Sequence, residues 1–198
     1  MTGLRERKKQ QTQDALSWAA VRLSVERGLE HVLVEDIAAE AGVSPRTFNN
    51  YFSSKAEAIV WRHLNRAVKA AERLRERPST EPLWESITAA LLDHDGGELR
   101  LPDPQWTAGV RLMLSEPALV GEFLKAGMAA ERECAAAIAE RIGVKPTDMY
   151  PQLVAAAMEA ARRTAIEQWL HADPPVPLAP LLREALRQIA AGLPDPSA

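Results

Sequence analysis

The chain has 198 residues, of which 46% are hydrophobic and 26% are charged, and its formal net charge is -3. These values are ordinary for a globular protein that is long enough to bury a core. The small negative charge excludes a polybasic protein that coats DNA without regard to its sequence.

Alanine and leucine supply most of the apolar residues, which favours an all-helical protein. The first predicted helix covers residues 5–27, where apolar residues recur at helical spacing until Gly28 ends the pattern. A later helix begins at the Ser53-Ser54 cap and runs to Arg77. The remaining predicted helices are 35–41, 45–51, 83–95, 105–114, 118–142, 147–171 and 178–191. We therefore expect an all-α fold of about nine helices.

Residues 35–52 have the pattern of two short helices joined by a tight turn. Gly42 can adopt a positive φ and end the first helix, and Val43 supplies an apolar contact for the turn. Ser44 can cap the second helix, and Pro45 suits its first position. This arrangement is typical of the helix-turn-helix that places its second helix in the DNA major groove.

The outward side chains of this second helix have the chemistry of a base reader. Arginine can bind guanine O6 and N7, and asparagine can bind adenine N6 and N7. The predicted base-reading residues are Arg46, Asn49 and Asn50. The predicted contacts to the DNA backbone are Ser44, Thr47, Tyr51 and Lys55. A helical hairpin with a solvated polar face is the alternative interpretation.

Residues 10–60 resemble the DNA-binding region of the TetR family of bacterial transcriptional regulators. The matching positions are Asp36-Ile37-Ala38, Ala41-Gly42-Val43-Ser44, Arg46-Thr47-Phe48, Tyr51-Phe52 and Ser54-Lys55. The resemblance implies a dimeric repressor that a small molecule releases from DNA. The family usually has Ser or Thr where Leu33 and Val34 stand, Tyr where Asn49 stands, and commonly Gly where Arg46 stands. The operator sequence is therefore not implied.

Proline residues in the stretch 78–82 mark one domain boundary. We expect a DNA-binding domain at 1–55, a connecting helix at 56–77, and a ligand-binding and dimerisation domain at 78–198. The connecting helix would then be the only direct mechanical link between the two halves. Alanine series beside a broad leucine face predict a homodimer through residues 147–191, with intrachain packing as the alternative. A dimer would bind two half-sites of a palindromic double-stranded DNA operator.

Bulky, adaptable side chains of the C-terminal part suit an apolar effector pocket, although each one singly is also an ordinary core residue. The candidates are Trp84, Trp106, Met113, Phe123, Met128, Met158, Arg162 and Trp169. Arg162 or Arg163 could anchor a carboxylate or phosphate, or could form a salt bridge. Residues 111–169 also resemble TetR regulators of the actinobacterial type that bind acyl-CoA-like ligands, which implies an acyl-type effector.

No catalytic or metal-binding constellation is recognisable. Cys134 is the single cysteine, which excludes a disulfide framework and suits the reducing cytoplasm, and its alanine surroundings predict an inert buried thiol. Asp93-His94-Asp95 could bind a metal, but the glycines that follow favour a solvated helix end. Residues 1–14 lack a signal peptide, and no segment has the roughly 20 apolar residues of a membrane span. We expect a cytoplasmic regulator that is not an enzyme and needs no cofactor.

Two charged regions bear on DNA binding in opposite directions. The first nine residues carry four basic residues and one acidic residue, and such an arm could contact phosphates or form a solvated terminus. The rival interpretation is a helical interaction protein whose degenerate motif does not bind DNA specifically. Its supports are Leu33 in place of the usual cap and the acidic residues near the helix-turn-helix, which are Glu30, Glu35, Asp36 and Glu40.

Overall fold

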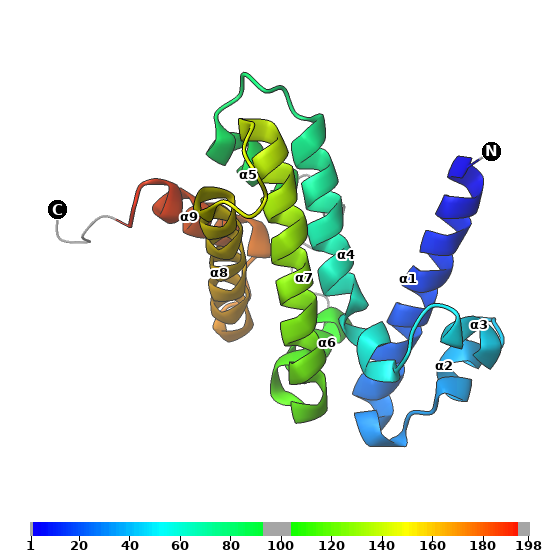
Figure 1. The fold of residues 1–198 in the computed structure, drawn as a ribbon. Helices are drawn as coiled ribbons and strands as arrows, with labels where there is room; N and C mark the ends of the chain where they lie inside the picture. Colours follow the sequence, from blue (N-terminus) through cyan, green and yellow to red (C-terminus); the bar gives the residue numbers. More distant parts are fainter. Residues whose placement is uncertain (1, 93–103, 194–198) are drawn as a thin grey trace. The chain divides into compact units, whose positions relative to one another are not determined.

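The structure is a computed structural model, and it describes residues 2–92 and 104–193. The elements within these ranges are helices, joined by short turns (Figure 1). They are α1 (Thr2–Arg27), the 3-10 helix η1 (Leu29–His31), α2 (Val34–Glu40), α3 (Pro45–Asn49), α4 (Lys55–Glu76), α5 (Leu83–Leu92), α6 (Pro104–Ser115), α7 (Pro117–Ile142), α8 (Met149–His171) and α9 (Leu178–Ala190). The predicted all-α fold is confirmed. The Asp93-His94-Asp95 stretch lies outside the described residues.

Packing divides the chain into two compact units. The first unit contains the described residues within 1–64 and 104–126, and the second contains those within 65–103 and 127–198. The division falls inside α4 and inside α7, so each of these helices contributes to both units. The expectation that α4 is the only direct link between two halves is therefore wrong, because α7 also continues from one unit into the other.

The core of the first unit surrounds α1. Leu16 and Leu23 of α1 are fully buried together with Phe48 of α3 and Phe52. Leu119, near the start of α7, is buried in the same hydrophobic cluster. The sequence periodicity predicts that the leucines of α1 and the two phenylalanines face inward. It does not indicate that Leu119, more than 60 residues later in the chain, completes their core.

On another side of α1, helix α6 approaches very closely. A Cβ atom added at Gly109 would lie 2.6 Å from Cγ1 of Val21. Real Cβ contacts are longer than this, so the approach depends on the missing side chain. Glycine weakens a helix interior by roughly 0.5–1 kcal/mol relative to alanine, and the close packing explains why α6 has one here.

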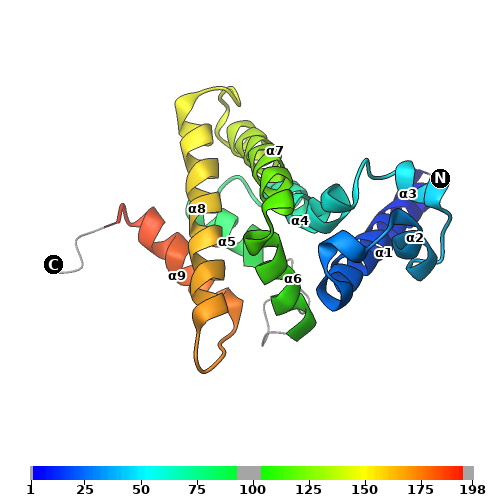
Figure 2. The same ribbon diagram turned by 90° about the horizontal axis from the view of Figure 1, so that it is seen from below.

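In the second unit, α8 and α9 lie side by side (Figure 2). α8 turns Val154, Met158 and Trp169 inward, and α9 buries Leu178, Leu182 and Leu186 at successive four-residue steps. Such spacing places one stripe of each helix against the core. α5 also packs against α9.

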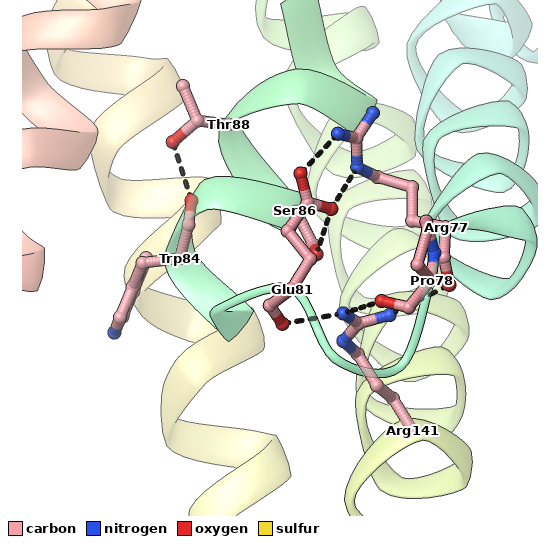
Figure 3. Close-up of polar contacts among 7 residues, drawn as sticks. All are labelled: Arg77, Pro78, Glu81, Trp84, Ser86, Thr88 and Arg141. Atoms are coloured by element: carbon pink, nitrogen blue, oxygen red, sulfur yellow. Dashed lines mark hydrogen bonds and ion pairs between the residues drawn. The ribbon is translucent and has the colours of Figure 1, made fainter.

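A polar cluster holds the turn between α4 and α5 (Figure 3). Glu81 accepts hydrogen bonds from Nε of Arg77 at 2.6 Å and from the Ser86 hydroxyl at 2.6 Å. Arg141 of α7 donates to the backbone carbonyls of Arg77 at 3.1 Å, Pro78 at 2.5 Å and Glu81 at 2.8 Å. The proline-rich break thus becomes a fixed corner, since Arg141 satisfies carbonyls that no longer have helical partners.

The hydrogen bonds from Arg77 and Ser86 lower the pKa of Glu81 from 4.5 to about 2. Because the pKa of Glu81 is lower in the folded than in the unfolded protein, the carboxylate stabilises the fold fully above about pH 4.5. This stabilisation is lost as the pH falls from about 4.5 to about 2.

We expect Glu81→Gln to lower the melting temperature at pH 7 and to differ less from the wild type at pH 3. Glu76→Gln, at an exposed position of α4, is the control and should match the wild type at both values. An equal deficit of E81Q at both pH values would contradict the role of the carboxylate charge.

Gly109→Ala should destabilise the first unit by about 1–3 kcal/mol, because the new methyl group overpacks against Val21. Val21→Ala removes the opposing methyl groups and should also destabilise, through a smaller side chain in the core. The double variant should be more stable than the sum of the two effects predicts. Urea unfolding of all four proteins measures this coupling, and strict additivity would show that α6 and α1 do not press on each other at this point.

Candidate nucleic-acid interface

The end of α2 has the hydrogen bonds of a Schellman turn. The Val43 N–H donates to the Ala38 carbonyl at 2.9 Å, and the Gly42 N–H donates to the Ala39 carbonyl at 3.1 Å. Gly42 has a φ of 69°, which explains the need for glycine at this point. Val43 packs against the core of the first unit. The turn between the two short helices is therefore fixed by both backbone bonds and apolar contact.

Ser44 begins the next helix as its N-cap. Its Oγ accepts from the Thr47 N–H at 3.1 Å, and the two hydroxyls lie 2.9 Å apart. Pro45 occupies the first turn, where its missing N–H costs no hydrogen bond. A cap of this kind contributes about 1 kcal/mol. The cap therefore orients the hydroxyls of Ser44 and Thr47, which are predicted to contact phosphates.

The outer face of α3 presents polar side chains to solvent. Arg46, Asn49 and Asn50 are exposed, whereas Phe48 is fully buried. The Phe48 and Phe52 ring centroids lie 5.7 Å apart, an edge-tilted pair that fixes the inner face. The three polar side chains project from one short helical segment whose inner face is packed in the core, an arrangement that suits base reading. Their contact with bases stays a prediction.

Lys55 has a structural task that sequence reasoning missed. Its Nζ donates to the Leu29 carbonyl at 2.5 Å and to the Val32 carbonyl at 3.0 Å. These bonds tie the start of α4 to the turn that precedes α2, and they use two of the three ammonium donors. No local pattern could have indicated them, because the partners lie 26 and 23 residues away.

The start of α4 confirms the predicted serine cap. Ser54 Oγ accepts from the Glu57 N–H at 3.1 Å, and the Glu57 carboxylate accepts from the Ser53 N–H at 2.7 Å. Tyr51, just before this start, is half-buried and packs against the core of the first unit. Helix α4, which follows the helix-turn-helix of residues 35–52, is therefore fixed at its first turn.

The acidic residues near the helix-turn-helix are partly neutralised by arginines. Glu40 forms an ion pair with Arg22, and an Asp36 carboxylate oxygen lies 4.0 Å from a guanidinium nitrogen of Arg27. Asp36 also accepts from the Leu33 N–H at 3.2 Å, so the backbone half of a capping box remains although leucine cannot cap. Glu30 and Glu35 are exposed. Arg5, Arg7, Lys8 and Lys9 are exposed on the first turns of α1, so the basic arm is helical.

The predicted pocket residues fall in both units. Met113 and Phe123 belong to the first unit, where Phe123 stacks on the buried His63 with centroids 4.6 Å apart. Those of the second unit are Trp84, Met128, Met158, Arg162 and Trp169. Met158 and Trp169 are buried there, whereas Met128 is 60% exposed. The side chain of Trp106 lies outside the described residues.

Of the two central arginines of α8, Arg162 forms the salt bridge. Its Nε lies 2.9 Å and its Nη2 lies 2.6 Å from the carboxylate oxygens of Glu159, one turn earlier on the helix. Arg163 is exposed. The alternative of a salt bridge is therefore realised at Arg162, and a ligand would have to compete with Glu159 for this guanidinium.

Within residues 2–92 and 104–193, no group of three or more His, Cys, Asp or Glu side chains could hold a metal ion. No helix in the same ranges has the length and apolar character that a membrane span requires.

Two family models match the chain. Residues 18–58 match the model described as "Bacterial regulatory proteins, tetR family", and residues 81–194 match the model described as "MftR C-terminal domain". The transcriptional regulator TcmR of Streptomyces glaucescens is 34% identical over 180 residues, which cover 86% of this chain and 79% of TcmR. A Mycobacterium tuberculosis protein proposed to be the mycofactocin biosynthesis regulator MftR is 30% identical over 188 residues, which cover 94% of this chain and 93% of that protein.

Solved structures share the fold. The TetR-family repressor FadR of Thermus thermophilus, solved with lauroyl-CoA, superposes with a TM-score of 0.55 at 19% identity and covers 94% of this chain and 97% of its own. SmeT, the repressor of a Stenotrophomonas maltophilia multidrug efflux pump, superposes with a TM-score of 0.57 at 17% identity and covers 94% of each chain. At such low identity the likeness concerns the fold alone.

Burial raises the pKa of the Cys134 thiol to about 12, so the reactive thiolate is scarce at neutral pH. We expect a disulfide reagent such as Ellman's to leave the folded protein unmodified and to label one thiol after unfolding in guanidinium. A Cys134→Ala variant that carries Ser79→Cys, at an exposed loop position, should react at once and serves as the positive control. Fast labelling of the folded wild type would show that Cys134 is accessible.

Proposed function

Because the chain belongs to the TetR family and is therefore a DNA-binding transcriptional regulator, we propose that it is a repressor which a small acyl-type molecule releases from its operator. The observation that carries the proposal is the exposed polar face of α3, held in place by buried Phe48 and Phe52. It acts in the cytoplasm, where the DNA lies, and has no catalytic role.

In the proposed complex, α3 enters the major groove. Arg46, Asn49 and Asn50 bind base edges, and Ser44, Thr47, Tyr51 and Lys55 contact the backbone. For Lys55, the contact would use the N–H that remains after its two carbonyl bonds. The exposed basic residues at the start of α1 add contacts to phosphates.

The proposed division of labour follows the chain. Residues 1–55 bind DNA, residues 56–77 connect, and residues 78–198 bind the effector and form the dimer. The homodimer uses the last two helices, about residues 147–191. Support comes from the outer face of α8, where Met149, Tyr150 and Leu153 are each more than half exposed. Apolar side chains in such number at one helix end are typical of an interface. The dimer would present two heads to a palindromic operator.

Two observations support an acyl-type effector. The C-terminal part resembles regulators of acyl-CoA-like ligands, and FadR, which shares the fold, was solved with lauroyl-CoA. A ligand that binds one head spacing better than another would shift the population away from the DNA-bound state. The predicted pocket set of Trp84, Trp106, Met113, Phe123, Met128, Met158, Arg162 and Trp169 belongs to this proposal.

The rival interpretation is an interaction protein that has lost specific DNA binding. Its two supports were Leu33 in place of the usual helix cap and the acidic residues near the helix-turn-helix. The pairing of Asp36 and Glu40 with arginines weakens the second support. A gel mobility shift with the protein's own promoter fragment at low salt separates the two interpretations. Absence of specific retardation would favour the rival.

Arg46→Ala should weaken operator binding by about 1–3 kcal/mol, a factor of roughly 5 to 150, and relax the preference at one base pair. Tyr51→Phe removes a backbone contact and should weaken binding to all sequences alike. Arg163→Ala, at an exposed position of α8, is the control and should bind as the wild type does. Fluorescence anisotropy with operator variants at fixed salt measures these constants. An unchanged base preference in R46A would refute the base-reading assignment.

A further inference from the structure

A groove of about 560 Å³ lies between α5 and α9 in the second unit. Its volume falls within the roughly 300–1,000 Å³ of small-molecule sites. One face of each helix lines it: Trp84, Glu85, Thr88, Ala89 and Leu92 from α5, and Arg183, Leu186, Arg187 and Ala190 from α9. The lining is mostly apolar, and no catalytic or DNA-binding residue proposed above belongs to it.

Small side chains on both helices create the hollow. Ala89 of α5 and Ala190 of α9 each contribute only a methyl group, whereas Leu186 is fully buried at the side of the core. Trp84 supplies a large flat surface (Figure 3), and it projects from α5 on the side away from Arg77 and Arg141. An apolar molecule could therefore bury its surface against indole, leucine and alanine without displacing a core residue.

The polar groups of the groove favour an anion. Arg183 and Arg187 stand one turn apart on α9, so their guanidinium groups share one face. The Glu184 carboxylate holds Arg187 through Nε at 2.8 Å and Nη2 at 2.7 Å, which leaves other N–H groups of the fork for a ligand. The Thr88 hydroxyl already donates to the Trp84 carbonyl at 2.7 Å, so the arginines are the main donors.

The charges around the groove favour an anion with a single negative charge. Two arginines and Glu85 line the groove, and the Glu184 carboxylate already pairs with Arg187. These four charges balance, so the groove has no excess positive charge for a polyanion, and the remaining arginine N–H groups suit one carboxylate. Carboxylates suit the planar guanidinium fork, which can bind both oxygens at once. A dianionic phosphate would meet no excess positive charge and would also be repelled by Glu85.

The groove occupies one flank of α9. With 100° between successive helix positions, Arg183 and Arg187 lie on one flank of the buried Leu182 and Leu186 stripe. The half-exposed Leu181 lies on the opposite flank. A second copy could thus cover that opposite flank of α9 and leave the groove open to a ligand.

We propose that the groove between α5 and α9 binds an apolar molecule that carries a single carboxylate, such as a medium-chain fatty acid. Binding itself does not depend on DNA. That this ligand is the effector rests on the proposed function, and it would place the effector on α9 rather than among the predicted pocket residues, of which only Trp84 lines the groove.

The test is calorimetric titration of the full-length, DNA-free protein with sodium decanoate, with 1-decanol as the uncharged probe. Both should bind the wild type, decanoate more tightly. Ala190→Leu fills the groove from an exposed position and should weaken both probes about tenfold. Arg183→Gln with Arg187→Gln should weaken decanoate about tenfold and leave decanol unchanged. Glu85→Gln should tighten decanoate a few-fold.

Arg163→Gln, outside the groove, removes one positive charge elsewhere on the exposed surface; it is the control and should bind decanoate as the wild type does. Circular dichroism verifies that each variant is folded. Equal decanoate affinity in the wild type and in A190L would overturn the site, and equal affinity in the double arginine variant would overturn its anion preference. If the wild type bound neither probe and A190L changed the dimer mass in sedimentation, the groove would be a contact between copies.

Binding of the wild type to its operator is measured in a separate experiment. If the wild type did not bind the operator, the proposed repressor function would be refuted, but the conclusion of the calorimetric titration about the groove would stand. Where both hold, decanoate should release the operator from the wild type and not from A190L.

Discussion

Burial of α1 on more than one side is the constraint on which the first unit depends. One side of the helix supports α2 and α3 through Leu16 and Leu23, and another side receives α6 where Gly109 meets Val21. Leu119 of α7 enters the same core. A helix packed in this way cannot move relative to one neighbour without disturbing the other, because close-packed interiors transmit displacement. Helix α3 and the start of α7, far apart in the sequence, therefore share one packed core.

Features set by neighbouring residues could be predicted from the sequence. The helix boundaries, to within two or three residues, the Gly42 turn and the Ser44 and Ser54 caps follow from hydrogen bonds between residues at most a few positions apart. The inward direction of Phe48 follows from the same local periodicity. The outline of the DNA-reading head thus belongs to the short-range information in the chain.

Features that join distant segments could not be predicted. Three features depend on how the helices come together: the bonds of Lys55 to residues 29 and 32, the hydrogen bonds of Arg141 to the α4–α5 corner, and the burial of Leu119 in the core of the first unit. An amphipathic stripe states that a helix has a buried face but does not name its partner. For the same reason, Trp84 could be recognised as a candidate ligand residue, whereas the arginines of α9 that face the same groove could not.

The outer face of α3 shares little with the interactions that keep the helix folded. Phe48, the Ser44 cap and the Gly42 turn provide its stability, while the Arg46, Asn49 and Asn50 side chains extend into solvent. Surface substitutions of this kind usually change stability by less than about 0.5 kcal/mol. In evolutionary terms, a duplicated copy of the protein could drift toward a new set of target promoters through a few codon changes. The scaffold would tolerate each intermediate, so regulatory rewiring would be limited by selection at the promoters rather than by folding.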